Sequence, residues 1–523
     1  MSRTDRFAIL IALAAILAAY LTAAQVFELI PHIEDEMAFV WQAQVYARGQ
    51  LSVASPAHPK NLMTPFVVDY HGQRFAKYPP GWSVVLAFGY LLGARAWVNP
   101  LLAGLAVWLT YRLGQKVFTP AVGLLAAFLT LISPFFLMLS GSLLSHTWSL
   151  VLSLAFVLAW LDTFTVTKHE GHQDHKELSK ESFVSLVFKS PPCWMTSLVA
   201  GLTLGLLALT RPLTAVGVAL PFFLHALFLL WRGGWDVRLL VLFVGAVSLL
   251  VSALLLLWQY ALTGNPFTNP YTLWWSYDNV GFGPAVGRQD GGHNLFWGWI
   301  SLKKALTTGW RDFFGWGGFS WLFLPFGLWA VRRNRPAWLI GSVFASLAGA
   351  YLLYWTGSMT FGPRYYFEGF HSITLLSAVG CLGLAGWSKT KGWKNSRFIG
   401  VAALLIFLVG YNLFSYLPTR LQEMRGLYGI ERADLLPFLT QEARALTPAI
   451  VVVYIQETWT DYGALLDLQD PWLTSPFIFA LGQSAATSSA LRADYPDRRL
   501  IHYYPDEPYT FYAQHLLGEN RGK

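Results

Sequence analysis

Long apolar stretches recur along most of the chain, separated by short polar or charged segments. An α-helix needs about 20 mostly apolar residues to cross the hydrocarbon core of a bilayer. Eleven stretches approach that length, at residues 7–29, 97–114, 119–139, 143–163, 195–210, 212–231, 238–260, 312–331, 337–356, 371–387 and 397–416. The pattern therefore predicts an all-α polytopic membrane protein with about eleven transmembrane helices.

A further apolar stretch, Trp82 to Gly93, has only about a dozen residues, which suits an interfacial or re-entrant helix. If it does not cross, the N-terminus and every later basic cluster face the cytoplasm, as basic residues prefer. Counting it as a span would place all of those later clusters outside. They are Arg112 with Lys116, the lysines of the linker 164–194, Arg232 with Arg238, Arg332 to Arg335, and Lys389 to Lys394.

In this topology the segments outside the cytoplasm are 30–96, 140–142, the 210–212 turn, 261–311, 357–370 and the tail 417–523. The tail changes character, because short strand-like segments there are interspersed with polar and helical ones. We expect strands at 449–455, 476–481 and 499–504 and a helix at 483–492. The chain is thus predicted to comprise a transmembrane domain at 1–416, including the outer loop 30–96, and a small soluble α/β domain outside the membrane at 417–523.

Composition agrees with lipid as the main solvent of this chain. Hydrophobic residues make up 54% of the 523 positions and charged residues only 13%, whereas soluble proteins carry about 25% charged residues. The net charge of +8 needs no nucleic-acid partner, because basic residues between membrane spans are expected on the cytoplasmic side.

Three carboxylates stand directly after the first predicted span, at Glu34, Asp35 and Glu36. They begin an expected helix at 37–48 whose apolar side chains share one face, as in a helix lying in the membrane interface: Met37, Val40, Trp41 and Val45. A helix N-terminus favours negative charge. Asp35 is therefore either a helix cap or a catalytic carboxylate, and the two roles are compatible.

Cationic side chains occur in the same outer segments and are candidate phosphate ligands. Lys77 lies at the expected membrane surface, where it either holds a lipid phosphate or is an ordinary interfacial lysine. Arg364 either binds phosphate through two N–H groups or pairs with Glu368. Arg211, at the outer turn of a helical hairpin, has the same ambiguity. His146 begins the fourth predicted span, where a histidine is costly without a partner.

Two other segments contain histidine or carboxylate side chains that the sequence does not assign to a functional site. Histidines recur at helical spacing in the linker 164–194 and indicate either metal binding or a solvated loop, which its predicted cytoplasmic side favours: His169, His172 and His175. The outer segment 261–311 is rich in Gly, Trp and Asn and is typical of a mobile lid. Its polar candidates are Asp278, Asp290 and His293.

Five short motifs occur in an order that resembles one family. They are Glu34-Asp35-Glu36, Lys77-Tyr78-Pro79-Pro80-Gly81-Trp82, Ser145-His146-Thr147, Leu209-Thr210-Arg211-Pro212 and Gly362-Pro363-Arg364-Tyr365-Tyr366. Together with the predicted topology, the region 7–416 resembles GT-C membrane glycosyltransferases, especially the branch with protein O-mannosyltransferases and lipid A aminoarabinose transferases.

The resemblance implies a polyprenyl-phosphate-linked sugar donor and inverting transfer to a hydroxyl of a protein, lipid or glycan acceptor, outside the cytoplasmic membrane. It implies Asp35 as general base with Glu36 beside it, and leaves open whether a divalent cation binds at Asp35. The remaining site residues that it implies are Lys77, Arg364 and Arg211 as donor-phosphate ligands and His146, Tyr365 and Tyr366 as substrate-binding residues.

Two other classes of function remain compatible with the sequence. A secondary transporter would place charged or broken-helix sites near the membrane midplane, whereas the ionisable residues here gather at the outer rim. A non-catalytic membrane subunit of an envelope glycan pathway would keep the fold without the chemistry. The presence of both Asp35 and Arg364 argues against that alternative.

Overall fold

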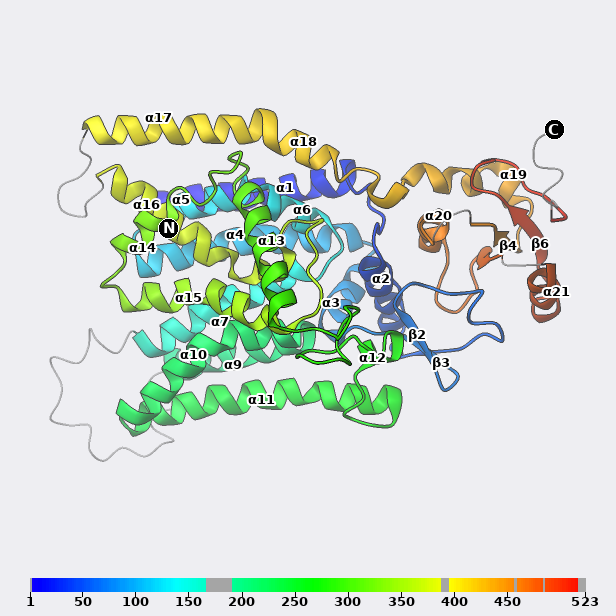
Figure 1. Ribbon diagram of the computed structural model, residues 1–523, viewed down its shortest axis with the longest axis horizontal. Helices are drawn as coiled ribbons and strands as arrows, with labels where there is room; N and C mark the ends of the chain where they lie inside the picture. Colours follow the sequence, from blue (N-terminus) through cyan, green and yellow to red (C-terminus); the bar gives the residue numbers. More distant parts are fainter. Residues whose placement is uncertain (1, 166–190, 387–394, 456–458, 483–484, 516–523) are drawn as a thin grey trace.

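The computed structural model describes residues 2–165, 191–386, 395–455, 459–482 and 485–515. The histidines of the linker, His169, His172 and His175, lie outside the described residues. A bundle of long helices running side by side forms most of the molecule, and the C-terminal strands lie beyond one end of it (Figure 1).

Within the described part of the chain, eight helices are long and apolar enough to cross a membrane. The protein is therefore a multi-pass membrane protein, while the total of eleven spans stays a prediction. Five of these spans are formed by α1 (Arg3–Gln25), α7 (His146–Thr165), α9 (Pro191–Thr210), α10 (Pro212–Arg232) and α11 (Trp235–Thr263). The other three are continuous with adjoining helical turns: Arg335–Leu353 contains α15 (Arg335–Ala350), Arg364–Leu384 contains α16 (Phe370–Leu384), and Ser396–Gly429 contains most of α17 (Asn395–Tyr411).

Two of the predicted apolar runs do not form one straight helix each. The run 119–139 is bent by 61° between α5 (Pro120–Leu131) and α6 (Pro134–Gly141), because Ser133 caps a new helix that begins at a proline. The run 312–331 is interrupted between α13 (Leu295–Asp312) and α14 (Leu324–Ala330). Three glycines with positive φ turn the chain there: Gly315, Gly317 and Gly318.

The remaining elements are shorter or lie at the ends of the spans. The helices are α2 (Glu34–Ala47), α3 (Pro80–Leu91), α4 (Val98–Val117), α12 (Pro270–Trp274), α18 (Leu417–Gln422), α19 (Gln441–Arg444), α20 (Thr460–Gly463) and α21 (Ala485–Asp494). Shorter helical turns are η1 (Arg95–Trp97), η3 (Tyr351–Leu353), η4 (Arg364–Gly369), η5 (Asn412–Tyr416), η6 (Leu427–Gly429), η7 (Arg432–Leu439) and η8 (Ala464–Leu468).

The helix after the carboxylate motif, α2, is not exposed to lipid as its apolar face suggested. Met37 is buried in one cluster with Ile430 and Tyr462, and Trp41 and Val45 are buried in another. The interface-helix prediction is therefore wrong for these side chains. Their partners are protein residues from the outer loop and the tail, which the pattern of α2 alone cannot reveal.

A small antiparallel sheet, which the sequence did not predict, delivers Lys77 to its place. It contains β1 (Val53–Ala54), β2 (Val67–Tyr70) and β3 (Gln73–Ala76) in the order β1-β3-β2. His71 and Gly72 both have positive φ in the turn between β2 and β3, as a tight hairpin requires. Lys77 follows β3 directly, and its amide donates to the Phe66 carbonyl at 3.0 Å.

The three strands expected in the tail form a parallel sheet. β4 (Ala449–Val453) lies in the centre, with β5 (Phe477–Leu481) and β6 (Arg499–Tyr503) on either side. All residues of β4 and β5 are buried, which explains their nearly continuous apolar sequences. The division of the chain into two domains at residue 416 remains a prediction.

An ion pair ties the tail to the membrane bundle. Both guanidinium Nη atoms of Arg95 donate to the Asp467 carboxylate at 2.6 Å. Arg95 also donates to the Leu29 carbonyl at 3.1 Å. Two-pronged pairs of this kind combine charge with fixed geometry, so this contact joins η8 to the chain that leaves α1.

Asp467→Asn should lower the midpoint of thermal unfolding of the detergent-solubilised protein. Hydrogen bonds to charged groups contribute about 1.5–3 kcal/mol each, and the variant leaves Arg95 without its opposite charge. The matched control is Asp497→Asn, an exposed carboxylate in the same tail, which should leave the midpoint unchanged. Equal midpoints for both variants would show that the Arg95 contact does not stabilise the fold.

Candidate active site

A cavity of about 720 Å³ lies where the outer loops meet the bundle. Its walls come from the start of α2, the segment after β3, the start of α7, the α9–α10 turn, the 261–294 segment and the chain from η3 to η4. The sequence-predicted residues that line it are Asp35, Lys77, His146, Arg211, Arg364 and Tyr365. Segments separated by hundreds of residues thus supply one site.

Asp35 lies in the first turn of α2 but is not its cap. The N-cap residue is Ile33, which makes no side-chain capping bond. The Asp35 carboxylate instead accepts a hydrogen bond of 2.6 Å from the Tyr78 hydroxyl and lies 3.4 Å from Arg364 Nη2. Burial alone would raise the pKa of Asp35, but the Arg364 charge, the Tyr78 hydrogen bond and Lys77 outweigh it and hold the pKa below its usual value. The carboxylate is ionised at neutral pH.

The two glutamates beside Asp35 are placed differently. Glu34 lines the cavity, whereas Glu36 is not among the lining residues. The Glu36 carboxylate accepts hydrogen bonds of 2.7 Å from the backbone amides of His32 and Leu143. Burial raises the pKa of Glu36 to about 7, against the lowering effect of these amides. Glu36 therefore links α2 to the chain before α7, away from the cavity.

Lys77 is a buried lysine in an aromatic enclosure, so the reading as an ordinary interfacial lysine is wrong. Its side chain is only 3% exposed, and its Nζ lies 3.8 Å from the centre of the Phe66 ring and 4.5 Å from that of Trp275. The ammonium pairs with Asp278 at 3.1 Å. Burial lowers the pKa of Lys77, although Asp278 and Asp35 partly oppose that effect.

Asp278 is a site residue whose partner the sequence did not reveal. Its second carboxylate oxygen accepts hydrogen bonds from the Tyr354 hydroxyl and the Trp355 indole, both at 3.0 Å. The 261–311 segment thus contributes a wall of the cavity at this point, and its role as a lid stays a prediction. The available signal was a lone carboxylate within an aromatic-rich segment, which indicates burial but not which cation it meets.

Arg364 pairs with Asp35 and not with Glu368, so the alternative pairing is wrong. Its two neighbours are also placed differently from one another. Tyr365 lines the cavity, whereas Tyr366 is buried outside it, with its ring centre 6.0 Å from that of Phe344.

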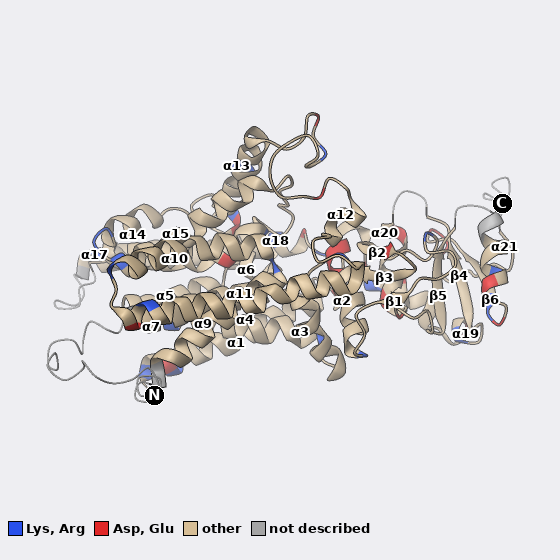
Figure 2. Ribbon diagram, turned by 90° about the horizontal axis from the view of Figure 1, so that it is seen from below, with Lys and Arg blue, Asp and Glu red and all other residues tan. Residues whose placement is uncertain are grey.

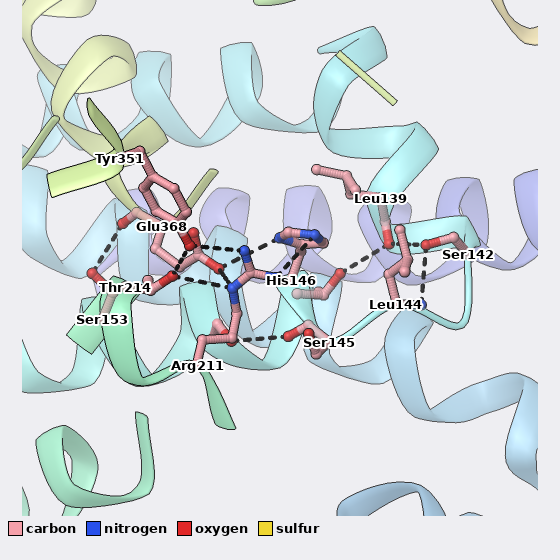
Figure 3. Close-up of polar contacts among 12 residues, drawn as sticks. Leu139, Ser142, Leu144, Ser145, His146, Ser153, Arg211, Thr214, Tyr351 and Glu368 are labelled. Carbon is pink, nitrogen blue, oxygen red and sulfur yellow. Dashed lines mark hydrogen bonds and ion pairs between the residues drawn. The ribbon is translucent and has the colours of Figure 1, made fainter. Parts of the chain in front are cut away.

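Arg211, His146 and Glu368 contact one another at one side of the cavity (Figure 3). Arg211 Nη1 lies 3.1 Å from His146 Nε2. Arg211 also donates to the hydroxyls of Tyr351 and Thr214, each at 3.1 Å. The Glu368 carboxylate lies 3.3 Å from Arg211 Nε and 3.5 Å from His146 Nδ1. The histidine thus has the partners that its depth requires.

One more cation, Arg288, lines the cavity and was not singled out by the sequence. Its guanidinium stacks over the rings of Trp275 and Trp355, at 4.4 and 5.6 Å from their centres. Aromatic stacking fixes an arginine without neutralising it. In the described ranges no carboxylate pairs with Arg288, whereas Lys77, Arg211 and Arg364 each have one.

The described residues contain no group of three or more His, Cys, Asp or Glu side chains arranged to hold a metal ion. Glu34, Asp35, His146 and Asp278 all line the cavity, but within the described residues no three of them are arranged to share one ion. We therefore derive no step of the chemistry through a divalent cation.

No family model matches the chain, and no curated protein matches its sequence. Solved structures do match. ArnT from Cupriavidus metallidurans bound to undecaprenyl phosphate has a TM-score of 0.56 at 14% identity, over 94% of this chain and 89% of that chain. AglB, the archaeal oligosaccharyltransferase from Archaeoglobus fulgidus, in complex with an inhibitory peptide and a dolichol-phosphate, has a TM-score of 0.51 at 14% identity, over 94% of this chain and 69% of that chain.

ArnT is an aminoarabinose transferase, and both it and AglB are GT-C membrane glycosyltransferases. At 14% identity the similarity to these structures concerns the fold alone. This fold is the one that the order of motifs along the sequence predicts. The chain has the GT-C fold.

Proposed function

We propose that this protein is a membrane glycosyltransferase that moves a sugar from a polyprenyl-phosphate carrier to an acceptor hydroxyl, with inversion at the anomeric carbon. The observation that carries the proposal is the position of Asp35, an ionised carboxylate facing a cavity whose walls also hold two buried cations, Lys77 and Arg364, and the partly buried Arg211. The lipid phosphates in the ArnT and AglB structures belong to those proteins, and they support the choice of donor class.

Asp35 is suited to be the general base. Direct inverting transfer needs a carboxylate that takes the proton of the attacking hydroxyl while the bond to the phosphate breaks. Asp35 is held on the first turn of α2 and steered by the Tyr78 hydroxyl at 2.6 Å. Because its pKa lies below the usual value, the base is ready without prior deprotonation.

The cations are suited to bind the phosphate and to stabilise its growing negative charge as the sugar departs. Lys77, Arg211 and Arg364 come from three separate segments and all line the same cavity. Their burial strengthens the interaction with an anion, because little water competes for it. A nucleotide-sugar site is not needed, since the lipid carrier presents the sugar at the membrane.

We place the reaction on the extracytoplasmic side, with an acceptor that is a protein, lipid or glycan. The segments that form the cavity walls are mainly those that the charge pattern assigns to the outside. Figure 2 shows Lys and Arg residues at the end of the bundle where the chain begins, opposite the C-terminal strands. Basic residues prefer the cytoplasmic side of a membrane, so this distribution supports the proposed orientation.

Asp35→Asn should reduce sugar transfer by about 10²–10⁴-fold, the usual contribution of a general base, and leave donor binding largely intact. The measurement is transfer of labelled sugar from a panel of polyprenyl-phosphate sugars to the acceptors of native membranes. Glu34→Gln is the matched control, because Glu34 lines the same cavity and is not assigned proton transfer. A rate for Asp35→Asn equal to that of the unmodified protein would refute the base.

Donor binding should weaken at alkaline pH because Lys77 must be charged to hold phosphate. The charged form exists below the lysine pKa, and burial lowers that pKa, so affinity falls as pH rises through a value below that of free lysine, about 10.4. Lys77→Arg should keep its charge and move the alkaline loss of affinity to higher pH. If the donor KM of Lys77→Arg and that of the unmodified protein changed identically between pH 7 and 10, Lys77 would be excluded from phosphate binding.

The orientation has its own test. Alkaline phosphatase fused after Lys523 should be active in intact cells, because that enzyme works only outside the cytoplasm. Green fluorescent protein fused at the same position should stay dark when exported by the same route. Fluorescence together with an inactive phosphatase would place the tail inside and reverse the assigned sidedness.

A further inference from the structure

Glu368 is a buried carboxylate that the proposed reaction does not use. It lies in η4, four residues after Arg364, and is 0% exposed. It is not among the residues that line the cavity. In the described part of the chain neither carboxylate oxygen accepts a hydrogen bond. A buried carboxylate is costly unless nearby charge compensates it, so its two close neighbours, Arg211 and His146, account for its presence.

Arg211 stands between Glu368 and the cavity. Its side chain is 15% exposed and lines the cavity, whereas Glu368 lies behind it. Three other groups contact the guanidinium: Thr214 at Nε, Tyr351 at Nη2 and His146 at Nη1. The residue is fixed at its backbone too, where the Arg211 amide donates to the Leu207 carbonyl at 2.7 Å. Each guanidinium nitrogen of Arg211 therefore has a protein contact, and Glu368 is the only carboxylate in described residues within ion-pair distance of it.

His146 completes a closed set of contacts (Figure 3). An arginine only donates hydrogen bonds, so His146 Nε2, which lies 3.1 Å from Arg211 Nη1, must be the unprotonated acceptor. The ring proton is then on Nδ1, which faces the Glu368 carboxylate at 3.5 Å. The charge of Glu368 thus acts on Arg211 both directly and through the orientation of His146.

We infer that Glu368 is a positioning residue that holds the Arg211 guanidinium, directly and through His146, in the orientation that binds the donor phosphate. This inference rests on the proposed function. It adds to that proposal a residue, Glu368, that does not touch the substrate. Arg211 is the phosphate ligand and Glu368 sets its direction.

The sign of one substitution separates positioning from simple charge balance. Glu368→Gln removes a negative charge next to Arg211 and keeps the side-chain shape. If Glu368 only offset the arginine charge, the variant would attract an anion more strongly. If Glu368 positions Arg211, the variant releases the guanidinium from its orientation and weakens phosphate binding. The two readings predict opposite changes in affinity.

The experiment measures binding of undecaprenyl phosphate, without a sugar, to the full-length protein in lipid nanodiscs. Glu368→Gln should weaken binding about tenfold, a size within the range of interaction energies between charged residues in contact. Glu368→Asp, which retains the charge and is shorter by one methylene, should give an intermediate affinity and serves as the test if the glutamine variant does not fold. Unchanged or tighter binding by these variants would overturn the inference.

A double-mutant cycle shows whether the effect passes through Arg211. Glu368→Gln should change nothing further in an Arg211→Met background and should keep its full effect in a Lys77→Met background. Additive losses with Arg211→Met would overturn the inference. The matched control is Asp312→Asn, which should not alter binding. Asp312 is a buried carboxylate that lies 3.3 Å from Arg420 Nε, and neither residue lines the cavity.

The same assay separates this inference from the proposal beneath it. Absence of undecaprenyl phosphate binding by the unmodified protein would overturn the proposed function, and this inference with it. Normal binding by the unmodified protein, together with independent effects at Glu368 and Arg211, would overturn the positioning role alone.

Discussion

The pairing of buried charges is the constraint on which the cavity and the outer loops around it depend. A charge removed from water is tolerated only when an opposite charge meets it, and three such meetings build the cavity. Asp35 meets Arg364 across 329 residues of chain, and Lys77 meets Asp278 across 201. The third pair joins Arg211 to Glu368. Each pair binds one outer segment to another, so the cavity and the arrangement of the loops are one structure.

Hydropathy predicted the membrane-spanning character well, because it is a property of long segments. Local backbone geometry was not predictable in the same way. The run 312–331 contains enough apolar residues for a span, but α13 ends at its first residue, and Gly315 and Gly317, which adopt positive φ, turn the chain before α14 begins. The short strands between Val53 and Ala76 were missed, since segments of two to four residues carry too little alternation to be read from sequence.

Most of the predicted side chains line the candidate site, whereas Glu36 and Tyr366 do not, and the pairs that the side chains form were not predictable. Arg364 and Glu368, four residues apart, would share a face on an α-helix. They lie on a 3₁₀ segment instead, where three residues complete a turn and positions four apart point in different directions. Arg364 therefore reaches Asp35, while Glu368 reaches Arg211. The partner of Lys77, Asp278, lies on a loop whose path only the folded chain determines.

The three pairs differ in exposure, and that difference distinguishes their roles in the proposed reaction. Lys77 and Asp278 are 3% and 2% exposed, and both line the cavity. Glu368 is fully buried and lies outside the cavity lining, behind Arg211. Asp35 is 21% exposed, and its contact with Arg364 is long, at 3.4 Å. In the proposed reaction, a phosphate bound to Arg364 would weaken the pairing of that cation with Asp35 and so raise the pKa of the carboxylate. Donor binding itself would then strengthen the base at the moment when the acceptor hydroxyl requires it.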